Sequence, residues 1–153
     1  MREYVTLIAS GKIATGGEVA THIALGADLV QIGRGFLFSI GCIQAMRCHT
    51  NTCPTGVTTQ NRWLQSGLDP ADKGLRVRNY ALALERDLEM ITYACGLTHP
   101  SQLHRGHVII NISPGVRKSL VELFPYPSNQ SGLGTTTNAR SERKSPVAVY
   151  VAS

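Results

Sequence analysis

The chain has 153 residues, of which 42% are hydrophobic and 16% are charged, and its formal net charge is +5 at pH 7. This length suits a single domain, and no stretch approaches the roughly 20 consecutive apolar residues that cross a bilayer. The basic residues are scattered and accompany no nucleic-acid-binding motif, so we expect the protein to bind neither nucleic acid nor membranes.

Two short strands with a helix between them are predicted at the start of the chain. Residues 4–9 (YVTLIA) and 29–32 are apolar runs of strand length, and we expect both to be buried. Thr15 is expected to cap a helix over residues 17–25, with Glu18 in its first turn. A strand, a helix and a strand within about 30 residues form a βαβ unit, so the strands should be parallel.

A second helix and a loop follow the second strand. Residues 36–47 predict a helix, and the Thr, Asn and Pro content of residues 49–60 predicts a loop. A helix start is then indicated by Asp69 and Pro70, a capping residue followed by proline at the first helical position. The leucine spacing beyond them predicts one long helix as far as Cys95.

That long helix is predicted to have a buried and a solvated side. Charged residues at 85–87 and 89 predict a solvated face. We expect Trp63 and Tyr80 to pack the helix against the domain, and Cys95 to be a core residue.

The last part of the chain is less regular. A short helix is expected over residues 99–104 and a small strand over 108–112. From Ser128 the sequence is polar, rich in Gly, Ser and Thr, and without periodicity, which predicts disorder. We therefore divide the chain into a folded part, residues 1–127, and a disordered tail, residues 128–153.

The predicted fold class is α/β, but one βαβ unit cannot cover both faces of its own parallel sheet. The chain therefore has the features of the end of a larger barrel or sheet. The first ten residues are also too polar for a secretory signal, and four cysteines in that context favour a reducing, cytoplasmic setting.

Three cysteines, Cys42, Cys48 and Cys53, have the spacing C-x5-C-x4-C, and a proline follows the last. Their thiolates could hold a three-iron cluster, or a four-iron cluster with Cys95 or a non-protein group as fourth ligand. With His49 they could instead form a Cys3His zinc site, although zinc ligands usually come in closer pairs. Three buried thiols are the alternative without a metal.

Two glycine turns follow the predicted strands. Gly11 and Lys12 come after the first strand, and Gly33, Arg34 and Gly35 come after the second. Glycine lets backbone N–H groups approach a phosphate closely, and a following helix N-terminus favours the negative charge. Since α/β barrels often bind phosphate at their last two strand–helix loops, the pair predicts a phosphate site, although each turn alone could be merely a tight turn.

The segment from residue 11 to residue 60, with CHTNTCPTGV as its most specific part, resembles the end of the FMN-binding synthase domain of glutamate synthase large subunits. It is similar in particular to the shorter stand-alone glutamate synthase-like proteins. The resemblance extends over residues 4–127 and includes LDPADKGLRVRNYALALERDLEMI and the closing LVELFPYP.

The resemblance implies a (β/α)8 TIM barrel that holds FMN beside a 3Fe-4S cluster. The family makes glutamate from 2-oxoglutarate and glutamine-derived or free ammonia, with electrons from an NAD(P)H-oxidising subunit or from ferredoxin. Carried over by position, Cys42, Cys48 and Cys53 would be cluster ligands. The two glycine turns, residues 11–12 and 33–35, would surround the FMN phosphate.

The resemblance begins at what would be the seventh strand of the barrel. Strands one to six, the 2-oxoglutarate site and the acid–base residues of the family have no counterpart, so the catalytic residues are unknown. We expect a fragment of about the last two β/α units plus C-terminal helices, inactive by itself. A second chain could supply the rest of the barrel, and a non-catalytic iron–sulfur module or a zinc-bound structural module are the alternatives.

Overall fold

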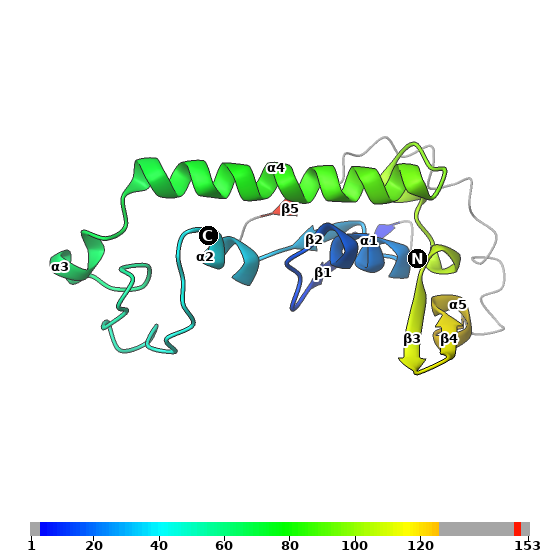
Figure 1. Ribbon diagram of the computed structural model, residues 1–153, viewed down its shortest axis with the longest axis horizontal. Coiled ribbons are helices and arrows are strands. Elements are labelled where there is room, and N and C mark those ends of the chain that lie inside the picture. The colour runs from blue at the N-terminus through cyan, green and yellow to red at the C-terminus, as the bar shows by residue number, and fades with distance from the viewer. Residues whose placement is uncertain (1–3, 126–148, 151–153) are drawn as a thin grey trace.

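The computed structural model describes residues 4–125 and 149–150. Helix α4 (Pro70–Ala94) runs along one side of the molecule, with β1 (Ile8–Ser10), α1 (Gly16–Leu25) and β2 (Leu29–Gln31) beneath it (Figure 1). This mixed arrangement agrees with the predicted α/β class. No helix in the described residues is long and apolar enough to cross a membrane.

Strands β1 and β2 are parallel, as predicted, and pair in the register Ile8 with Leu29 and Ser10 with Gln31. Helix α1 begins as its sequence indicates. The Thr15 hydroxyl accepts a hydrogen bond from the Glu18 backbone, and the Glu18 carboxylate accepts one from the Thr15 backbone N–H at 3.0 Å. This reciprocal pair is a capping box, which satisfies N–H groups that an α-helix leaves free at its start.

The helix predicted over residues 36–47 is much shorter in the structure. Helix α2 spans only Arg34–Ser39, because Gly41 takes a left-handed conformation (φ 100°) and Cys42 N–H donates back to the Leu37 carbonyl at 3.0 Å. A glycine in this conformation commonly ends a helix. Gln44 and Met46 also have positive φ, which excludes a continuing helix.

Helix α4 agrees closely with its prediction. The Asp69 side chain accepts a hydrogen bond from Ala71 N–H at 3.1 Å, Pro70 occupies the first turn, and Cys95 is the C-terminal cap. The helix packs against α1 and α2, and Tyr80 contributes to this contact as predicted. Its ring meets that of Phe36 edge-on at 4.9 Å, and its hydroxyl donates to the Ala14 carbonyl at 2.7 Å.

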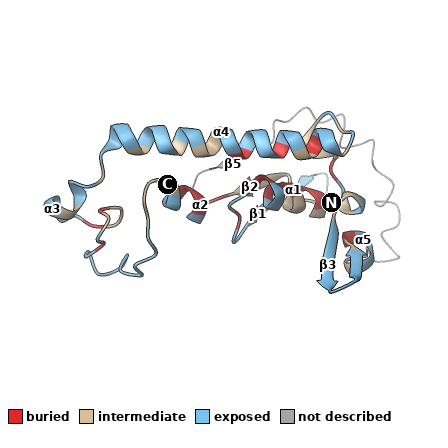
Figure 2. Cartoon of the chain, in the orientation of Figure 1, coloured by how far each residue is buried: buried red, intermediate tan, exposed pale blue. Residues whose placement is uncertain are grey.

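The hydrophobic core lies between α1, β2 and the inner side of α4, where Figure 2 shows the buried residues gathered. Cys95 packs at its edge, as predicted. The buried members of this core are Ile13, Val19, Ala20, Ile23, Ala24, Val30, Ile32, Phe36, Leu84, Leu88 and Leu103.

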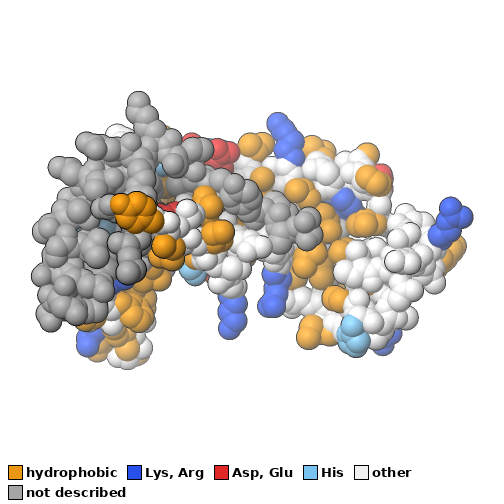
Figure 3. Space-filling model, turned by 180° about the vertical axis from the view of Figure 1, so that it is seen from behind, with side chains coloured by type: hydrophobic (Ala, Val, Ile, Leu, Met, Phe, Trp, Pro, Cys, Tyr) orange, Lys and Arg blue, Asp and Glu red, His pale blue; other side chains and the backbone are white. Residues whose placement is uncertain are grey.

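The prediction that the first strand is buried is wrong. Strand β1 begins only at Ile8, which is 59% exposed, and Tyr4, Val5 and Leu7 before it are exposed as well. Strand β1 is at an edge of the sheet, and no strand in the described residues pairs with its outer edge. Figure 3 shows hydrophobic side chains at the surface in several places on the rear face of the molecule.

Trp63 also departs from its prediction, since it is 83% exposed on the short helix α3 (Arg62–Gln65). Helix α3 follows the cysteine-bearing loop, at the opposite end of the molecule from the hairpin of β3 (Ile109–Ser113) and β4 (Val116–Ser119) (Figure 1). The indole therefore does not pack α4 against the domain.

The C-terminal part forms 3-10 turns and a hairpin. The 3-10 turn Pro100–Gln102 lies where a short helix was predicted over residues 99–104, and a second 3-10 turn, Arg105–His107, follows it. The predicted strand is β3 (Ile109–Ser113), which pairs with an unpredicted antiparallel strand, β4 (Val116–Ser119). Helix α5 (Leu120–Leu123) follows.

Arg105 connects this C-terminal part to the core. Its guanidinium donates to the Phe124 carbonyl beyond α5 and, at 3.4 Å, to the Leu25 carbonyl at the end of α1.

Strand β5 (Val149–Tyr150) pairs in parallel with β2, on the side opposite β1. It lies within the segment whose composition predicted disorder. The rest of that predicted tail, residues 128–148 and 151–153, lies outside the described residues.

Candidate functional site

The two glycine turns leave the sheet side by side. Ser10, the last residue of β1, is level with Gln31, the last residue of β2. Neighbouring strands are about 4.8 Å apart, so the turns that begin at Gly11 and Gly33 lie at the same edge. This is the carboxyl edge of the parallel strands, where α/β proteins bind ligands.

The first turn is sharp, and both turns have room for a ligand. Gly11 and Lys12 both have positive φ, 118° and 55°. A side-chain carbon placed on Gly11 or Gly33 would meet nothing within 4 Å. Lys12 and Arg34 are exposed at these turns, so the edge carries positive charge and open space.

The surroundings of Gly35 differ from those of Gly11 and Gly33. It is buried, and a side-chain carbon there would overlap the Tyr80 hydroxyl and lie 3.1 Å from Ile32 Cγ2. The same hydroxyl donates to the Ala14 carbonyl. The absence of a side chain at Gly35 therefore lets α4 approach α2, which is a packing role that the sequence did not reveal.

We expect Gly35→Ala to destabilise the fold by about 1–3 kcal/mol, because the added methyl group displaces the tyrosine from its hydrogen bond. Gly33→Ala is the matched control, since Gly33 has an ordinary φ of −98° and open space around it. Chemical denaturation measures both free energies of unfolding. Equal losses for the two variants would show that Gly35 has no special packing role.

The three cysteines lie on or beside the long loop between α2 and α3. Cys42 is half-buried just beyond α2, Cys48 is exposed, and Cys53 is buried with 8% of its surface exposed. All are free thiols. The structure does not gather them: within residues 4–125 and 149–150, no group of three or more His, Cys, Asp or Glu side chains is placed to hold a metal ion.

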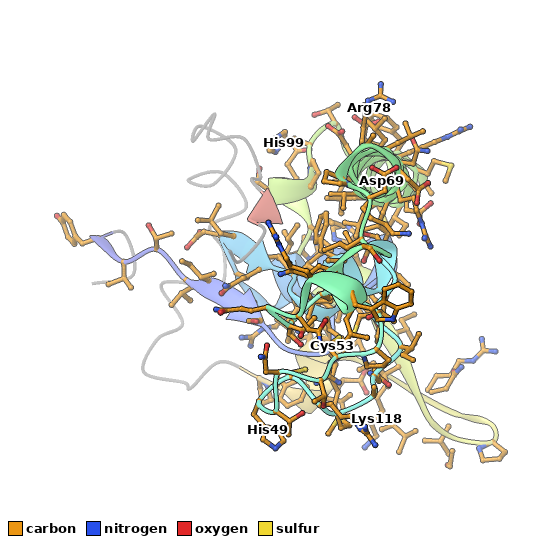
Figure 4. The ribbon with its side chains drawn as sticks, turned by 90° about the vertical axis from the view of Figure 1, so that its left-hand side faces the viewer. His49, Cys53, Asp69, Arg78, His99 and Lys118 are labelled. Carbon is orange, nitrogen blue, oxygen red and sulfur yellow. The ribbon has the colours of Figure 1, made fainter. Side chains whose placement is uncertain are left out.

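His49 gives no support to a zinc site in this conformation. It is exposed, and Figure 4 shows it at the outer part of the loop, directed away from Cys53.

Cys53 has an environment suited to a thiolate. Thr55 Oγ1 lies 3.4 Å from Cys53 Sγ. Hydrogen bonds from the Thr55 side chain and the Thr58 backbone lower the pKa of Cys53 from 9.0 to about 6, because they stabilise the charged sulfur. At neutral pH the residue is mostly in the form that binds metals and reacts as a nucleophile.

Asn51 holds the loop in shape around this thiol. It has a left-handed φ of 59°, and its side-chain oxygen accepts a hydrogen bond from Gln60 N–H at 2.6 Å. Its backbone carbonyl accepts one from the Thr59 hydroxyl at 2.6 Å. The segment from 51 to 60 is thus closed upon itself, whereas Cys42 and Cys48 lie outside it. Sequence reasoning missed these roles, although the run of Thr and Asn beside the last cysteine was visible.

Thr55→Val should raise the pKa of Cys53 from about 6 toward 9, since valine has no hydroxyl to donate. Alkylation of each cysteine, followed by mass spectrometry across a pH series, measures this shift. Thr50→Val is the control because its hydroxyl bonds the Arg47 carbonyl and Thr52 instead. An unchanged alkylation profile in Thr55→Val would contradict the assignment.

The same hydrogen bonds should make stability depend on pH. The folded pKa lies below the unfolded value, so the thiolate stabilises the folded chain fully above about pH 9, and this contribution is lost as the pH falls through about 6. We expect the pH dependence to weaken in Thr55→Val.

Comparison with known proteins shows the family to which this chain belongs. The family model for the conserved region in glutamate synthase matches residues 1–98, a span that contains both glycine turns, the three loop cysteines and all of α4. The chain belongs to the glutamate synthase family.

Relatives from the glutamate synthase family match most of the chain. It is 42% identical over 115 residues to the glutamate synthase large subunit-like protein YerD of Bacillus subtilis, covering 75% of this chain and 22% of that protein. It is 36% identical over 97 residues to the archaeal glutamate synthase [NADPH] of Methanocaldococcus jannaschii, covering 63% and 19%. It is 34% identical over 111 residues to the ferredoxin-dependent glutamate synthase of Cyanidium caldarium, covering 72% and 7%. The chain therefore spans about a fifth or less of each of these relatives.

The glutamate synthase family implies two bound groups, FMN and an iron–sulfur cluster. The residues present fit these two groups to different extents. At the glycine turns, open backbone and two exposed cations suit a phosphate. In the loop, the donor set of three cysteines suits an iron–sulfur cluster, and Cys53 is already disposed to ionise. The three sulfurs are not gathered around one point in the described residues.

Proposed function

We propose that the chain is part of a glutamate synthase-type flavoenzyme that converts 2-oxoglutarate and ammonia, free or from glutamine, to glutamate. Family membership supports this proposal. The observation that carries it is a pair of uncrowded glycine turns at the carboxyl edge of two parallel strands, followed after α2 by a loop with three free thiols.

The FMN phosphate is proposed to bind between the two glycine turns. Backbone N–H groups near Gly11 and Gly33 can approach the phosphate because no side chain is in the way. Lys12 and Arg34 supply positive charge. Gly35, in contrast, keeps α2 against Tyr80, so it orients the turn without needing to touch the ligand.

The three loop cysteines, Cys42, Cys48 and Cys53, are proposed to hold a 3Fe-4S cluster. When bound, the cluster supplies electrons to the flavin, and the reduced flavin supplies hydride for reductive amination. Cys53 is proposed to form the first metal–sulfur bond, since its hydrogen bonds keep the thiol mostly ionised at neutral pH. Binding would then draw Cys42 and Cys48 toward it and order the remainder of the loop.

The fold is proposed to be the last two β/α units of a (β/α)8 barrel. Strand β1 has an unpaired edge and exposed apolar residues before it, Tyr4, Val5 and Leu7. A further parallel strand from the same protein or from a second chain would cover this side. The electron donor, an NAD(P)H-oxidising subunit or ferredoxin, is part of the same proposal.

The same exposed edge of β1 also favours a second candidate, an iron–sulfur electron-transfer module completed by another chain. The two candidates differ in whether flavin binds when the missing strands are supplied.

The test is a flavin and metal assay of the purified chain, with and without a polypeptide carrying the preceding six strands of a relative. We expect FMN to bind stoichiometrically only in the mixture, and iron to be retained. Iron without flavin in the mixture supports the electron-transfer module instead. Zinc in place of iron would reject both candidates and support a structural zinc module.

A further inference from the structure

Helix α4 has a second apolar stripe on the side that is turned away from the core. Leu75, Leu82, Met90 and Tyr93 are 55%, 47%, 53% and 61% exposed. Their spacing of seven, eight and three residues puts them on one face of the helix, opposite the buried Leu88. The polar residues Asn79 and Arg86 lie on the same face between them. Figure 2 shows this outer side exposed along the length of α4. The helix is therefore apolar on two sides but covered on only one by the described residues.

The charges on α4 divide between its two halves. The half from residue 70 to 82 carries three cations and one carboxylate, and the half from 83 to 94 carries three carboxylates and one cation. The net charges are +2 and −2. Among the described residues, the only ion pair that α4 makes is between Lys73 and Asp72, at 2.9 Å. The charged groups are Asp72, Lys73, Arg76 and Arg78 in the first half, and Glu85, Arg86, Asp87 and Glu89 in the second.

The charges that border the stripe also follow helical spacing. Arg78, Glu85 and Glu89, seven and four residues apart, lie along one flank, and Arg76 and Asp87 lie along the other. Figure 4 shows Arg78 projecting away from the core. Each flank thus carries a cation toward the start of the helix and carboxylates toward its end.

We propose that this outer face of α4 pairs with the same face of a second copy of the chain, with the two helices antiparallel. A two-fold axis between Leu82 and Ala83 brings Leu75 level with Met90 of the second copy. Self-complementary surfaces of this kind form two-fold dimers. The inference does not depend on the proposed enzymatic function.

The antiparallel arrangement is favoured because it alone brings opposite charges together. With this axis, each flank meets the same flank of the second copy, so Arg78 lies between the levels of Glu85 and Glu89, and Arg76 lies near Asp87. A parallel pair would place each flank beside the opposite flank of the second copy, so Arg78 would lie near Arg76, and Glu85 and Glu89 near Asp87, where like charges repel. The charges therefore specify the orientation, and the apolar stripe supplies the buried surface.

A hollow of about 480 Å³ begins at the proposed axis and extends toward the C-terminal half of α4. It is lined by Leu82, Ala83, Arg86, Asp87 and Met90. In the proposed dimer, each copy's Leu82 lies level with Ala83 of the other, at the edge of this hollow. Apolar anchors in central pockets commonly dominate the binding energy of interfaces.

The first test is sedimentation of the full chain over a range of concentrations, with Leu82→Glu as the variant. We expect a monomer–dimer equilibrium whose dissociation constant rises at least about tenfold in Leu82→Glu. Circular dichroism should show unchanged helix content, because Leu82 is exposed. A chain that stays monomeric at all concentrations, as expected if a different protein covers this face, overturns the proposal.

Charge exchange then tests the specificity. Arg78→Glu should weaken the dimer by about tenfold, since it opposes two carboxylates of the second copy. Adding Glu85→Arg and Glu89→Arg to the same chain exchanges the signs on this flank and should restore the dissociation constant. Failure of this triple variant to recover would contradict the proposed alignment.

Cross-linking tests the orientation. In a Cys48→Ser background, Ala83→Cys should form a disulfide between copies, because the axis passes beside this position. Asn79→Cys should not, since Asn79 faces Arg86 of the second copy. Cross-linking of both variants would indicate a parallel pair, and cross-linking of neither would indicate association through another surface such as β1; both results overturn the proposal.

Discussion

Cys53→Ser should abolish the uptake of an iron–sulfur cluster. The hydrogen bonds from Thr55 and Thr58 keep the native thiol ionised near neutral pH, whereas a serine hydroxyl stays protonated and binds iron poorly. The measurement is anaerobic reconstitution followed by iron and sulfide analysis and visible absorbance. We expect about three irons in the native chain, as a three-iron cluster requires, and none in the variant.

Cys95→Ser is the control for this loss. Cys95 packs at the edge of the hydrophobic core, beyond the end of α4. The variant should keep its cluster if the three loop cysteines are the ligands, and lose one iron-binding sulfur if Cys95 completes a four-iron cluster. Uptake of iron by Cys53→Ser, or of zinc alone by the native chain, would contradict the proposed ligand set.

Leu88→Ala should be among the most destabilising single substitutions, at about 2–5 kcal/mol. Leu88 is 5% exposed and lies in the core where α4 packs against α1. Its truncation leaves a cavity between these two helices. The free energy of unfolding, from denaturant titration, measures the effect.

Leu75→Ala makes the same chemical change on the exposed side of α4. At concentrations where the chain is monomeric, it should cost less than about 1 kcal/mol. If the two leucines had similar effects, α4 would not be attached to the core by the side that the structure shows.

Elements with local capping signals could be predicted from the sequence. Thr15 with Glu18, and Asp69 with Pro70, each start a helix within one residue of the expected position. Their hydrogen bonds join residues close in the chain, so no tertiary information is needed. The parallel pairing of β1 and β2 likewise follows from the length of the connection between them.

Elements that depend on backbone conformation or distant contacts could not be predicted in the same way. Gly41 lies inside an apolar run that favours a helix, and only its left-handed φ shows that α2 ends there. The hairpin of β3 and β4 was missed although Pro114 and Gly115 between the two strands are turn-forming residues.

The candidate site was predictable in composition but not in arrangement. The spacing of the cysteines and glycines shows which residues belong to the candidate site. The packing role of Gly35, in contrast, depends on Tyr80, which is distant in sequence. The low pKa of Cys53 depends on hydrogen bonds from Thr55 and Thr58, which only the folded conformation of the loop provides. The three sulfurs are not gathered in the described part of the chain, so the metal site that their spacing predicts stays a prediction.

The most direct test of the proposed function is a chimera with the archaeal glutamate synthase [NADPH] of Methanocaldococcus jannaschii. The segment of that protein that matches this chain is replaced by residues from this chain. The chimera is then assayed for glutamate formed from 2-oxoglutarate and ammonia. We predict that the chimera makes glutamate and loses this activity with Cys53→Ser. A chimera that folds and binds flavin but makes no glutamate would contradict the assignment of this chain to a glutamate-forming flavoenzyme.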